Sequence, residues 1–172
     1  MKGKKLKDKK TRKIFILSII FIAIDQITKI LAIQFKNLSL GFIKINCASN
    51  VGFAFGLNQN NFTNILLAII VLGIICNFIH QQKEKIDNKI IFSLAMVIAG
   101  GIGNLIDRIL RGAVVDFIDI GNFPIFNLAD CFVVIGWIIL VYNLLDYLKY
   151  DIKFMEVNVK NKTEVKKNCK KK

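Results

Sequence analysis

Four long apolar runs, separated by polar connections, dominate the chain. They extend over about residues 14–33, 62–79, 90–110 and 128–145. Each run is long enough to cross about 30 Å of hydrocarbon as a helix that rises about 1.5 Å per residue. No small-residue cleavage site follows the first run, so a retained helix is expected there rather than a signal peptide. The pattern predicts an all-α membrane protein with four transmembrane helices.

The connection between the first two runs is not a simple linker. Its start, GFIKIN, alternates apolar and polar residues, and further glycines follow at Gly52 and Gly56. Alternation with period two is typical of strands, and glycine permits tight turns. We therefore expect short strands on the membrane surface. The stretch QNNFTN then predicts a turn and the start of the second helix.

Basic residues gather at both ends of the chain. The formal net charge is +13, and lysines crowd residues 1–13 and 148–172. Because short basic segments stay on the cytoplasmic side of a membrane, this asymmetry favours two cytoplasmic termini over a nucleic-acid-binding face. We expect a basic cytoplasmic N-terminus (1–13), a four-helix membrane domain (14–147) and a basic, disordered cytoplasmic tail (148–172). Membrane lipids with anionic headgroups are compatible partners.

Acidic residues concentrate at the outer ends of the helices in this orientation. Five of the twelve acids fall there: Asp25, Asp107, Asp116, Asp119 and Asp130. A carboxylate near a bilayer is costly unless it is compensated, so each is a functional candidate. Any chemistry is therefore expected at the outer leaflet.

The composition excludes several common types of active site. The one histidine, His80, begins a basic connection and is interpreted as an interfacial residue. Ser–His–Asp, Cys–His and most zinc sites therefore lack their imidazole. The four cysteines form no CxxC spacing, which excludes a thiol-redox centre and argues against a disulfide framework.

Asp25 and Lys29 lie four residues apart in the first helix, so they share a face and can pair. The structural interpretation is an ion pair near the interface, with Lys29 extending its ammonium outward to water. The functional interpretation is that one of the two orients a polar substrate at the outer end of the helix.

Asp107 and Arg108 follow Asn104 by three and four residues, so all three lie on one side of the third helix. They would either hold helices together as a polar network or bind a phosphate, a carboxylate or a peptide carbonyl. The glycines of GGIGN, just before, permit close approach between helices.

Asp116 and Asp130 are the strongest candidates for chemistry. Asp116 lies in the strand-like stretch AVVDF, among apolar neighbours. Asp130 is near the start of the fourth helix, where Asn127 can act as N-cap and the helix dipole favours a carboxylate. This capping role competes with catalysis for Asp130, but it does not explain Asp116. Asp119 is expected to be solvated.

A loop that folds back to the fourth helix would bring the two carboxyls to one water. Carboxyls about 3 Å apart cannot both ionise, so one pKa rises and the pair holds a single proton. The ionised carboxylate then takes a proton from water, which attacks a carbonyl carbon, while the protonated one donates to the carbonyl oxygen. Such a pair can hydrolyse a peptide bond without metal, serine or thiol.

The segments DQITK, NVGFAFG, GNLIDR, VVDF and FNLAD occur in this order at these helix ends. Together they resemble the signal peptidase II family, the lipoprotein signal peptidases, which are bacterial membrane aspartyl proteases. The resemblance covers about residues 25–130 and implies that Asp116 and Asp130 form the catalytic dyad. It implies supporting or substrate-contacting roles for eight further residues: Asp25, Lys29, Asn50, Gly52, Asn104, Asp107, Arg108 and Asn127.

The resemblance also implies a fold and a reaction. Members of this family remove the signal peptide of a prolipoprotein before a cysteine that carries a diacylglyceryl group, at the outer side of the bacterial cytoplasmic (inner) membrane. They have a strand-rich extracytoplasmic cradle between helices 1 and 2 and an amphipathic helix over the site. They need no metal or other cofactor, and globomycin blocks them. Phe53 departs from the family pattern, which leaves the shape of the substrate channel and inhibitor fit open. We expect a monomer.

Two other classes of protein are alternatives. A small ion-coupled transporter would bind protons or cations at membrane-edge carboxylates, but it predicts acids near mid-membrane. A structural helix bundle would use the same polar residues only to join helices. In such a bundle, aspartate-to-asparagine variants would change stability more than activity.

Overall fold

Helices make up most of the described part of the chain. The computed structural model describes residues 2–35, 38–52, 60–82, 87–143, 145–146 and 149. Its helices are α1 (Lys2–Gln34), α2 (Asn61–Gln82), α3 (Asn88–Arg111) and a C-terminal helix, Leu128–Asn143. Phe53, Gly56 and the tail beyond Lys149 lie outside the described residues, as does the predicted amphipathic helix if it falls in 53–59. The division into 1–13, 14–147 and 148–172 stays a prediction.

Three helices are long and apolar enough to cross a membrane. Within the described residues, these segments are Lys9–Gln34, Asn61–Gln81 and Asn88–Arg111, with mean hydropathies of 2.1, 2.5 and 1.9. The C-terminal helix is apolar but shorter, roughly 24 Å at 1.5 Å per residue. The prediction of a multi-pass helical membrane protein is confirmed, and the count of four spans stays a prediction.

Helix ends follow local capping rules. The Asn60 side chain accepts a hydrogen bond from the Phe62 amide at 3.0 Å, which confirms the turn predicted before α2. The Asp87 side chain accepts from the Ile90 amide at 2.8 Å at the start of α3. This helix ends at Gly112, whose φ of 78° is the left-handed conformation that glycine adopts without a steric penalty.

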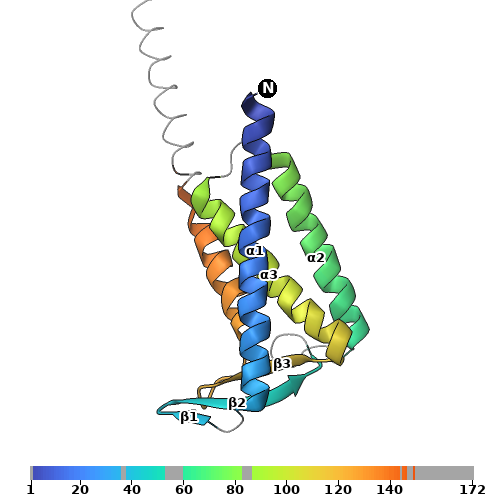
Figure 1. Cartoon of the computed structure of the whole chain (residues 1–172), viewed down its shortest axis with the longest axis vertical. Coiled ribbons are helices and arrows are strands. Elements are labelled where there is room, and N and C mark those ends of the chain that lie inside the picture. Colours follow the sequence, from blue (N-terminus) through green and yellow to red (C-terminus); the bar gives the residue numbers. More distant parts are fainter. Residues whose placement is uncertain are drawn as a thin grey trace, which may run out of the picture.

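A three-stranded antiparallel sheet lies across one end of the helices, opposite the N-terminus (Figure 1). Its strands are β1 (Leu38–Leu40), β2 (Ile43–Asn50) and β3 (Val114–Asp119), in the order β1-β2-β3. The strands predicted between the first two helices and the strand-like surroundings predicted for Asp116 are therefore confirmed. The sheet joins two connections that are far apart in the sequence at the same end of the bundle.

A β-bulge in β2 sets which residues face the helices. Ile45 pairs with Ile118 and Ala48 pairs with Asp116, so a step of three residues along β2 corresponds to a step of two along β3. The extra residue shifts the alternation of β2 by one. Asn50 therefore shares a face of the sheet with Asp116, which strict alternation from Ile45 would not allow.

Small residues of α3 bring its neighbours close. A Cβ on Gly100 would lie 2.3 Å from the Ala129 carbonyl oxygen, and one on Gly103 would lie 2.6 Å from an Asp25 carboxylate oxygen. A Cβ on Gly101 would lie 3.2 Å from Leu72. The prediction that these glycines permit close helix packing is confirmed.

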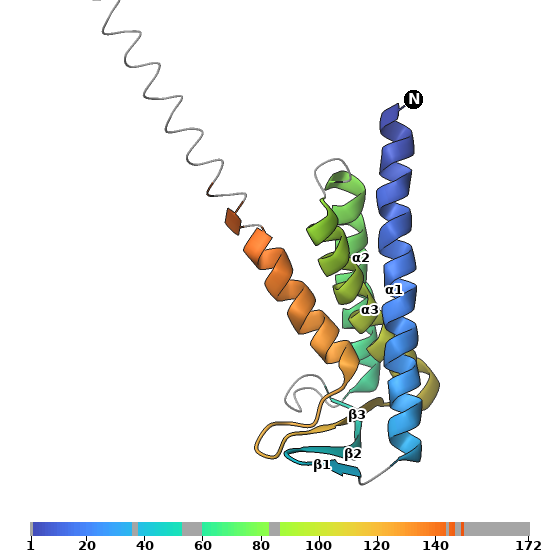
Figure 2. The ribbon, with the colours of Figure 1, turned by 60° about the vertical axis from the view of Figure 1, so that its left-hand side comes forward.

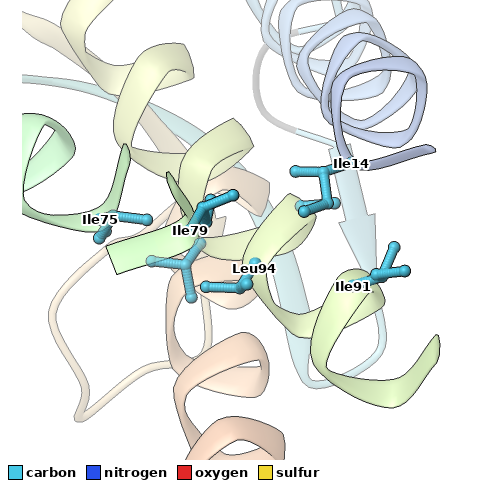
Figure 3. Packing of buried hydrophobic residues seen from close by; sticks show 7 residues of the cluster. Ile14, Ile75, Ile79, Ile91 and Leu94 are labelled. Carbon is cyan, nitrogen blue, oxygen red and sulfur yellow. The ribbon is translucent and has the colours of Figure 1, made fainter. Parts of the chain in front are cut away.

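The apolar core lies toward the end of the bundle remote from the sheet. It joins α1, α2 and α3 through the residues labelled in Figure 3: Ile14, Ile75, Ile79, Ile91 and Leu94. Large apolar side chains on the outside of α1 and α2 are exposed, as expected of surfaces that face lipid. The apolar core and the polar residues described next therefore occupy different levels of the bundle.

Candidate active site

Asp116 is buried and held by two asparagines. It lies in β3, is 3% exposed, and its two carboxylate oxygens accept from different amides. The Asn50 amide donates to Oδ2 at 2.8 Å, and the Asn127 amide donates to Oδ1 at 2.6 Å. The neutral donors fix the plane of the carboxylate without supplying a positive charge.

Asn127 and Asp130 form a reciprocal cap at the start of the C-terminal helix. The backbone N–H of Asp130 donates to Asn127 Oδ1 at 3.0 Å, and the backbone N–H of Asn127 donates to Asp130 Oδ2 at 3.1 Å. This is the hydrogen-bond pattern of a capping box. The predicted capping role is confirmed, and the same residue contacts Asp116, so Asn127 connects the two carboxylates.

Asn104 completes the network from α3. Its amide donates to Asp130 Oδ1 at 2.8 Å, while its carbonyl oxygen accepts from Asn127 at 3.1 Å and from Lys29 at 3.0 Å. The two donors at its oxygen direct the Asn104 amide nitrogen toward Asp130. Each of the four carboxylate oxygens of Asp116 and Asp130 thus accepts an N–H.

The surroundings of Asp116 change its acidity. Burial is the largest influence and raises the pKa of Asp116 to about 6. The hydrogen bond from Asn50 opposes this change, the negative charge of Asp130 adds to it, and Asn127 and Lys29 oppose it more weakly. A carboxyl group with this pKa can hold or release a proton near neutral pH, as acid–base catalysis requires.

Arg108 reaches the sheet from α3. It is 9% exposed, and one guanidinium nitrogen donates to the Gly52 carbonyl at 3.1 Å. The Gly52 amide in turn donates to Asn50 Oδ1 at 2.9 Å, which fixes the turn after β2. Arg108 also interacts electrostatically with Asp116 and Asp130, so a positive charge faces the pair from outside hydrogen-bond reach.

A second buried cluster lies between α1 and α3. Lys29 is fully buried, 2.9 Å from Asp25 Oδ2 and 2.8 Å from Asp107 Oδ2. The interpretation that Lys29 extends outward to water is therefore wrong. Two carboxylates and the Asn104 oxygen satisfy its ammonium inside the protein, so it has no need of solvent.

The network contains three groups that the sequence analysis did not single out. Gln26 donates to Asp25 at 3.1 Å and to the Gly103 carbonyl at 3.2 Å, and Arg111 pairs with Asp107. The Ala129 backbone amide donates to Asp25 Oδ1 at 3.0 Å. The i,i+4 spacing of Asp107 and Arg111 could have revealed that pair, whereas the Ala129 contact has no sequence signal.

The ten residues predicted from the sequence form one connected network. The path runs from Arg108 through Gly52 and Asn50 to the pair, and from the pair through Asn104 to Lys29 and its two acids. Asp119 lies outside it, where its carboxylate accepts from the Gly121 amide at 2.9 Å at the surface. Its predicted solvation agrees with this position.

Other candidate ligands are dispersed. Cys47, Cys76 and Cys131 are free, and His80 is exposed in the last turn of α2. In the part of the chain that the structure describes, no group of three or more His, Cys, Asp or Glu side chains could hold a metal ion.

Known proteins resemble the chain in sequence and in structure. It is 40% identical over 128 residues to a lipoprotein signal peptidase of Caldanaerobacter subterraneus subsp. tengcongensis, which covers 69% of this chain and 86% of the relative. It is 39% identical over 142 residues to a lipoprotein signal peptidase of Shouchella clausii, and the match covers 76% of this chain and 91% of that relative.

Two solved structures, each a bacterial membrane enzyme studied by the in meso method, have the same fold. The first, at 2.3 Å, has a TM-score of 0.69 at 29% identity over 77% of this chain and 87% of that one. The second, at 1.9 Å, has a TM-score of 0.68 at 28% identity over 77% and 92%. The model of the family described as signal peptidase (SPase) II matches residues 17–146. The chain therefore belongs to the signal peptidase II family.

Proposed function

We propose that the protein is an aspartic endopeptidase that removes the signal peptide from diacylglyceryl-modified prolipoproteins. It cleaves before the lipidated cysteine, with Asp116 and Asp130 as the catalytic pair and with no metal or other cofactor. The family and the names of the similar relatives support a peptidase that acts on lipoproteins. The observation that supports the aspartic mechanism is that Asn127 binds both carboxylates.

The two carboxyls have different surroundings, which suggests different roles. Asp130 lies in the first turn of a helix, where the dipole stabilises an ionised carboxylate. Asp116 has the raised pKa of about 6. We therefore assign the shared proton to Asp116 and the role of general base to Asp130.

The reaction then proceeds in two steps. Asp130 takes a proton from water, the water oxygen bonds to the scissile carbonyl carbon, and Asp116 donates its proton to the carbonyl oxygen. The tetrahedral intermediate collapses when the C–N bond breaks: Asp130 gives its proton to the leaving amine, and Asp116 recovers a proton from the hydroxyl group. Both carboxyls return to their starting state.

The location of the pair suits a substrate that is bound to a membrane. Asp116 is in β3 and Asp130 is in the first turn of the C-terminal helix, and Figure 2 shows that helix beginning beside the sheet, at the sheet-side end of the bundle. We place the chain in the bacterial cytoplasmic membrane with four spans, both termini in the cytoplasm and the pair at the outer leaflet. The positive charge of Arg108 would then orient the polar backbone of the substrate beside the carboxylates.

The test is cleavage of a diacylglyceryl-modified prolipoprotein by the purified chain in lipid nanodiscs. The assay includes the unmodified prolipoprotein, a metal chelator, a globomycin-type inhibitor and the Asp116→Asn variant. We expect the parent alone to cut the modified substrate, to be indifferent to chelator and to be blocked by the inhibitor. Failure of a well-folded parent on both substrates would instead support the transporter or the structural bundle.

A further inference from the structure

The sheet has an apolar end. Phe42, in the turn between β1 and β2, is 83% exposed. Ile120 and Phe123, in the loop after β3, are 42% and 51% exposed, and Leu38 of β1 is 47% exposed. Phe123 stacks edge-on against Phe126 with ring centroids 5.8 Å apart, which orders the loop. We call Leu38, Phe42, Ile120 and Phe123 the apolar tip.

Strand register places the tip at the end of the sheet away from the carboxylate pair. Lys44, two residues after Phe42, pairs with Asp119, the last residue of β3. The turn that contains Phe42 and the loop that contains Phe123 therefore leave the sheet at the same end. Figure 1 and Figure 2 both show this end of the β1–β2 hairpin extending sideways beyond the helices.

The two faces of the sheet differ in polarity near the tip. On one face, Lys44 lies between Ser39 and Asp119 in neighbouring strands. The next residue, Ile45, is on the other face and lies between Leu38 and Ile118. Because side chains alternate along a strand, one face is polar and the other apolar.

The apolar face is the one that faces the helices. Asp116 is two residues before Ile118 in β3, so both share this face, and Asp116 contacts Asn127 at the start of the C-terminal helix. Where the β1–β2 hairpin extends beyond the helices, this face lies at the same height as the ends of the apolar helices (Figure 2). Exposed apolar residues also follow α1 to its sheet-side end, where Phe35 is 61% exposed, and Leu38 at the start of β1 is exposed as well.

We propose that the apolar tip inserts into the boundary between headgroups and acyl chains of the leaflet on the sheet side, and anchors the sheet there. Interfacial segments bury aromatic and leucine side chains at this depth and turn a polar face to water. Continuity with the exposed apolar surface of α1 favours lipid over a protein partner. Since Asp116 belongs to the same sheet, the anchor sets the depth of the carboxylate pair, a consequence that rests on the proposed function.

Tryptophan fluorescence tests the anchor without any assay of activity. The chain has a single tryptophan, Trp137, so Trp137→Phe gives a silent background. Into it we would introduce Phe42→Trp, or Ser39→Trp as a control that is on the polar face three residues away. Each protein is placed in nanodiscs with lipids brominated near the headgroup or deep in the acyl chain.

We expect the tryptophan at position 42 to emit at shorter wavelength than the one at position 39. Shallow brominated lipid should quench it at least about twofold more, and aqueous iodide should quench it less. Equal iodide quenching at both positions, with no response to brominated lipid at position 42, would overturn the proposal. If the parent chain did not cleave the modified substrate while the tryptophan of Phe42→Trp still lay in lipid, the proposed function would be refuted and the anchor would stand.

The double variant Phe42→Ser and Phe123→Ser provides a second measurement. Without these lipid contacts, the double variant in nanodiscs should show faster hydrogen exchange of the backbone amides of β1 and β2 than the parent. The backbone amides of the helices should change little. Unchanged exchange of β1 and β2 in the double variant would contradict an anchor that holds the sheet.

Discussion

The protein contains two carboxylate pairs, one fully buried and one formed by the buried Asp116 and the partly exposed Asp130, and they are compensated in different ways. Asp25 and Asp107 flank the Lys29 ammonium, and Arg111 adds a second cation, so the charges of that cluster cancel. Asp116 and Asp130 accept hydrogen bonds from neutral amides, and within the described residues no Lys or Arg side chain forms an ion pair with either.

The difference distinguishes a structural cluster from a reactive one. Carboxylates paired with buried cations join α1 to α3 through ion pairs, and removing the shared cation would leave them without a partner. Carboxylates that accept hydrogen bonds only from neutral donors keep their geometry without a direct ion pair, and burial raises the pKa of Asp116 to about 6, so Asp116 can take up a proton. The amide-bound pair is therefore where acid–base chemistry is expected, and the ion cluster supports it through the contact between Lys29 and Asn104.

The largest expected effect separates the amide-bound pair from a surface acid. Asp116→Asn and Asp130→Asn should each lower kcat/KM for lipoprotein cleavage by about 100- to 10,000-fold, because each removes a proton-transfer group. Both proteins should still insert and fold. Asp119→Asn should change kcat/KM by no more than about twofold, as surface substitutions usually do. Loss at Asp119 with activity kept at Asp116 would reassign the pair.

The ion cluster should respond in stability. Lys29→Met leaves Asp25 and Asp107 buried without their shared cation, and breaking a buried ion pair costs about 3–5 kcal/mol of unfolding free energy. Lys44→Met, at an exposed position, should cost no more than about 0.5 kcal/mol. Unfolding curves in mixed detergent would measure both. Equal stability of the two variants would remove the distinction between the pairs.

The contribution of Asp116 to the unfolding free energy should decrease as pH rises. The pKa of Asp116 is raised from 3.8 to about 6, so its contribution to stability is fully present below about pH 4 and is lost as pH rises through about 6. Relative to Asp116→Asn, the parent should lose up to about 3 kcal/mol between pH 4 and pH 7, at about 1.4 kcal/mol per pKa unit.

Asp119 supplies a control of opposite sign. The Gly121 amide and then Asn46 hold the pKa of Asp119 below its ordinary value. Its contribution is therefore present above about pH 4 and is lost as pH falls. Unfolding midpoints of the parent, Asp116→Asn and Asp119→Asn at pH 4 and pH 7 would check the direction of both effects. If the parent and Asp116→Asn changed equally with pH, the effect expected of Asp116 would be refuted.

The smallest expected effect concerns how α3 positions Asp130. Gly100→Ala forces a Cβ to within 2.3 Å of the Ala129 carbonyl, one residue before Asp130, and should cost about 1–3 kcal/mol with a parallel loss of kcat. A Cβ on Gly73 of α2 meets nothing within 4 Å, so Gly73→Ala should not destabilise. If Gly100→Ala kept full activity at reduced stability, tight packing there would not be needed for catalysis.

Hydropathy and strand alternation predicted the elements well. The apolar runs matched α2, α3 and the C-terminal helix within a few residues at both ends, whereas α1 begins at Lys2, twelve residues before the predicted run. GFIKIN and AVVDF lie largely in β2 and β3. The capping relation between Asn127 and Asp130 was also predicted, because it depends on residues three apart. Local patterns carry this information since each involves neighbours in the chain.

Contacts between distant segments could not be read in this way. Asn50 and Asp116 are 66 residues apart, and they meet only because a bulge in β2 shifts the alternation. Lys29 was expected to pair with Asp25 and to extend outward to water, whereas Asp107 and Asn104 contact it from another helix. The family resemblance had pointed to these residues, but not to their bonds with one another.

Asn127 has a consequence for how the protein would lose activity on heating. Its side-chain nitrogen binds Asp116 and its backbone N–H binds Asp130, while this backbone N–H and its side-chain oxygen also close the first turn of the C-terminal helix. Fraying of that single turn, a low-energy local opening compared with separation of the bundle, would dismantle the pair. Thermal inactivation should therefore precede global melting, and cooling should restore activity as the turn re-forms.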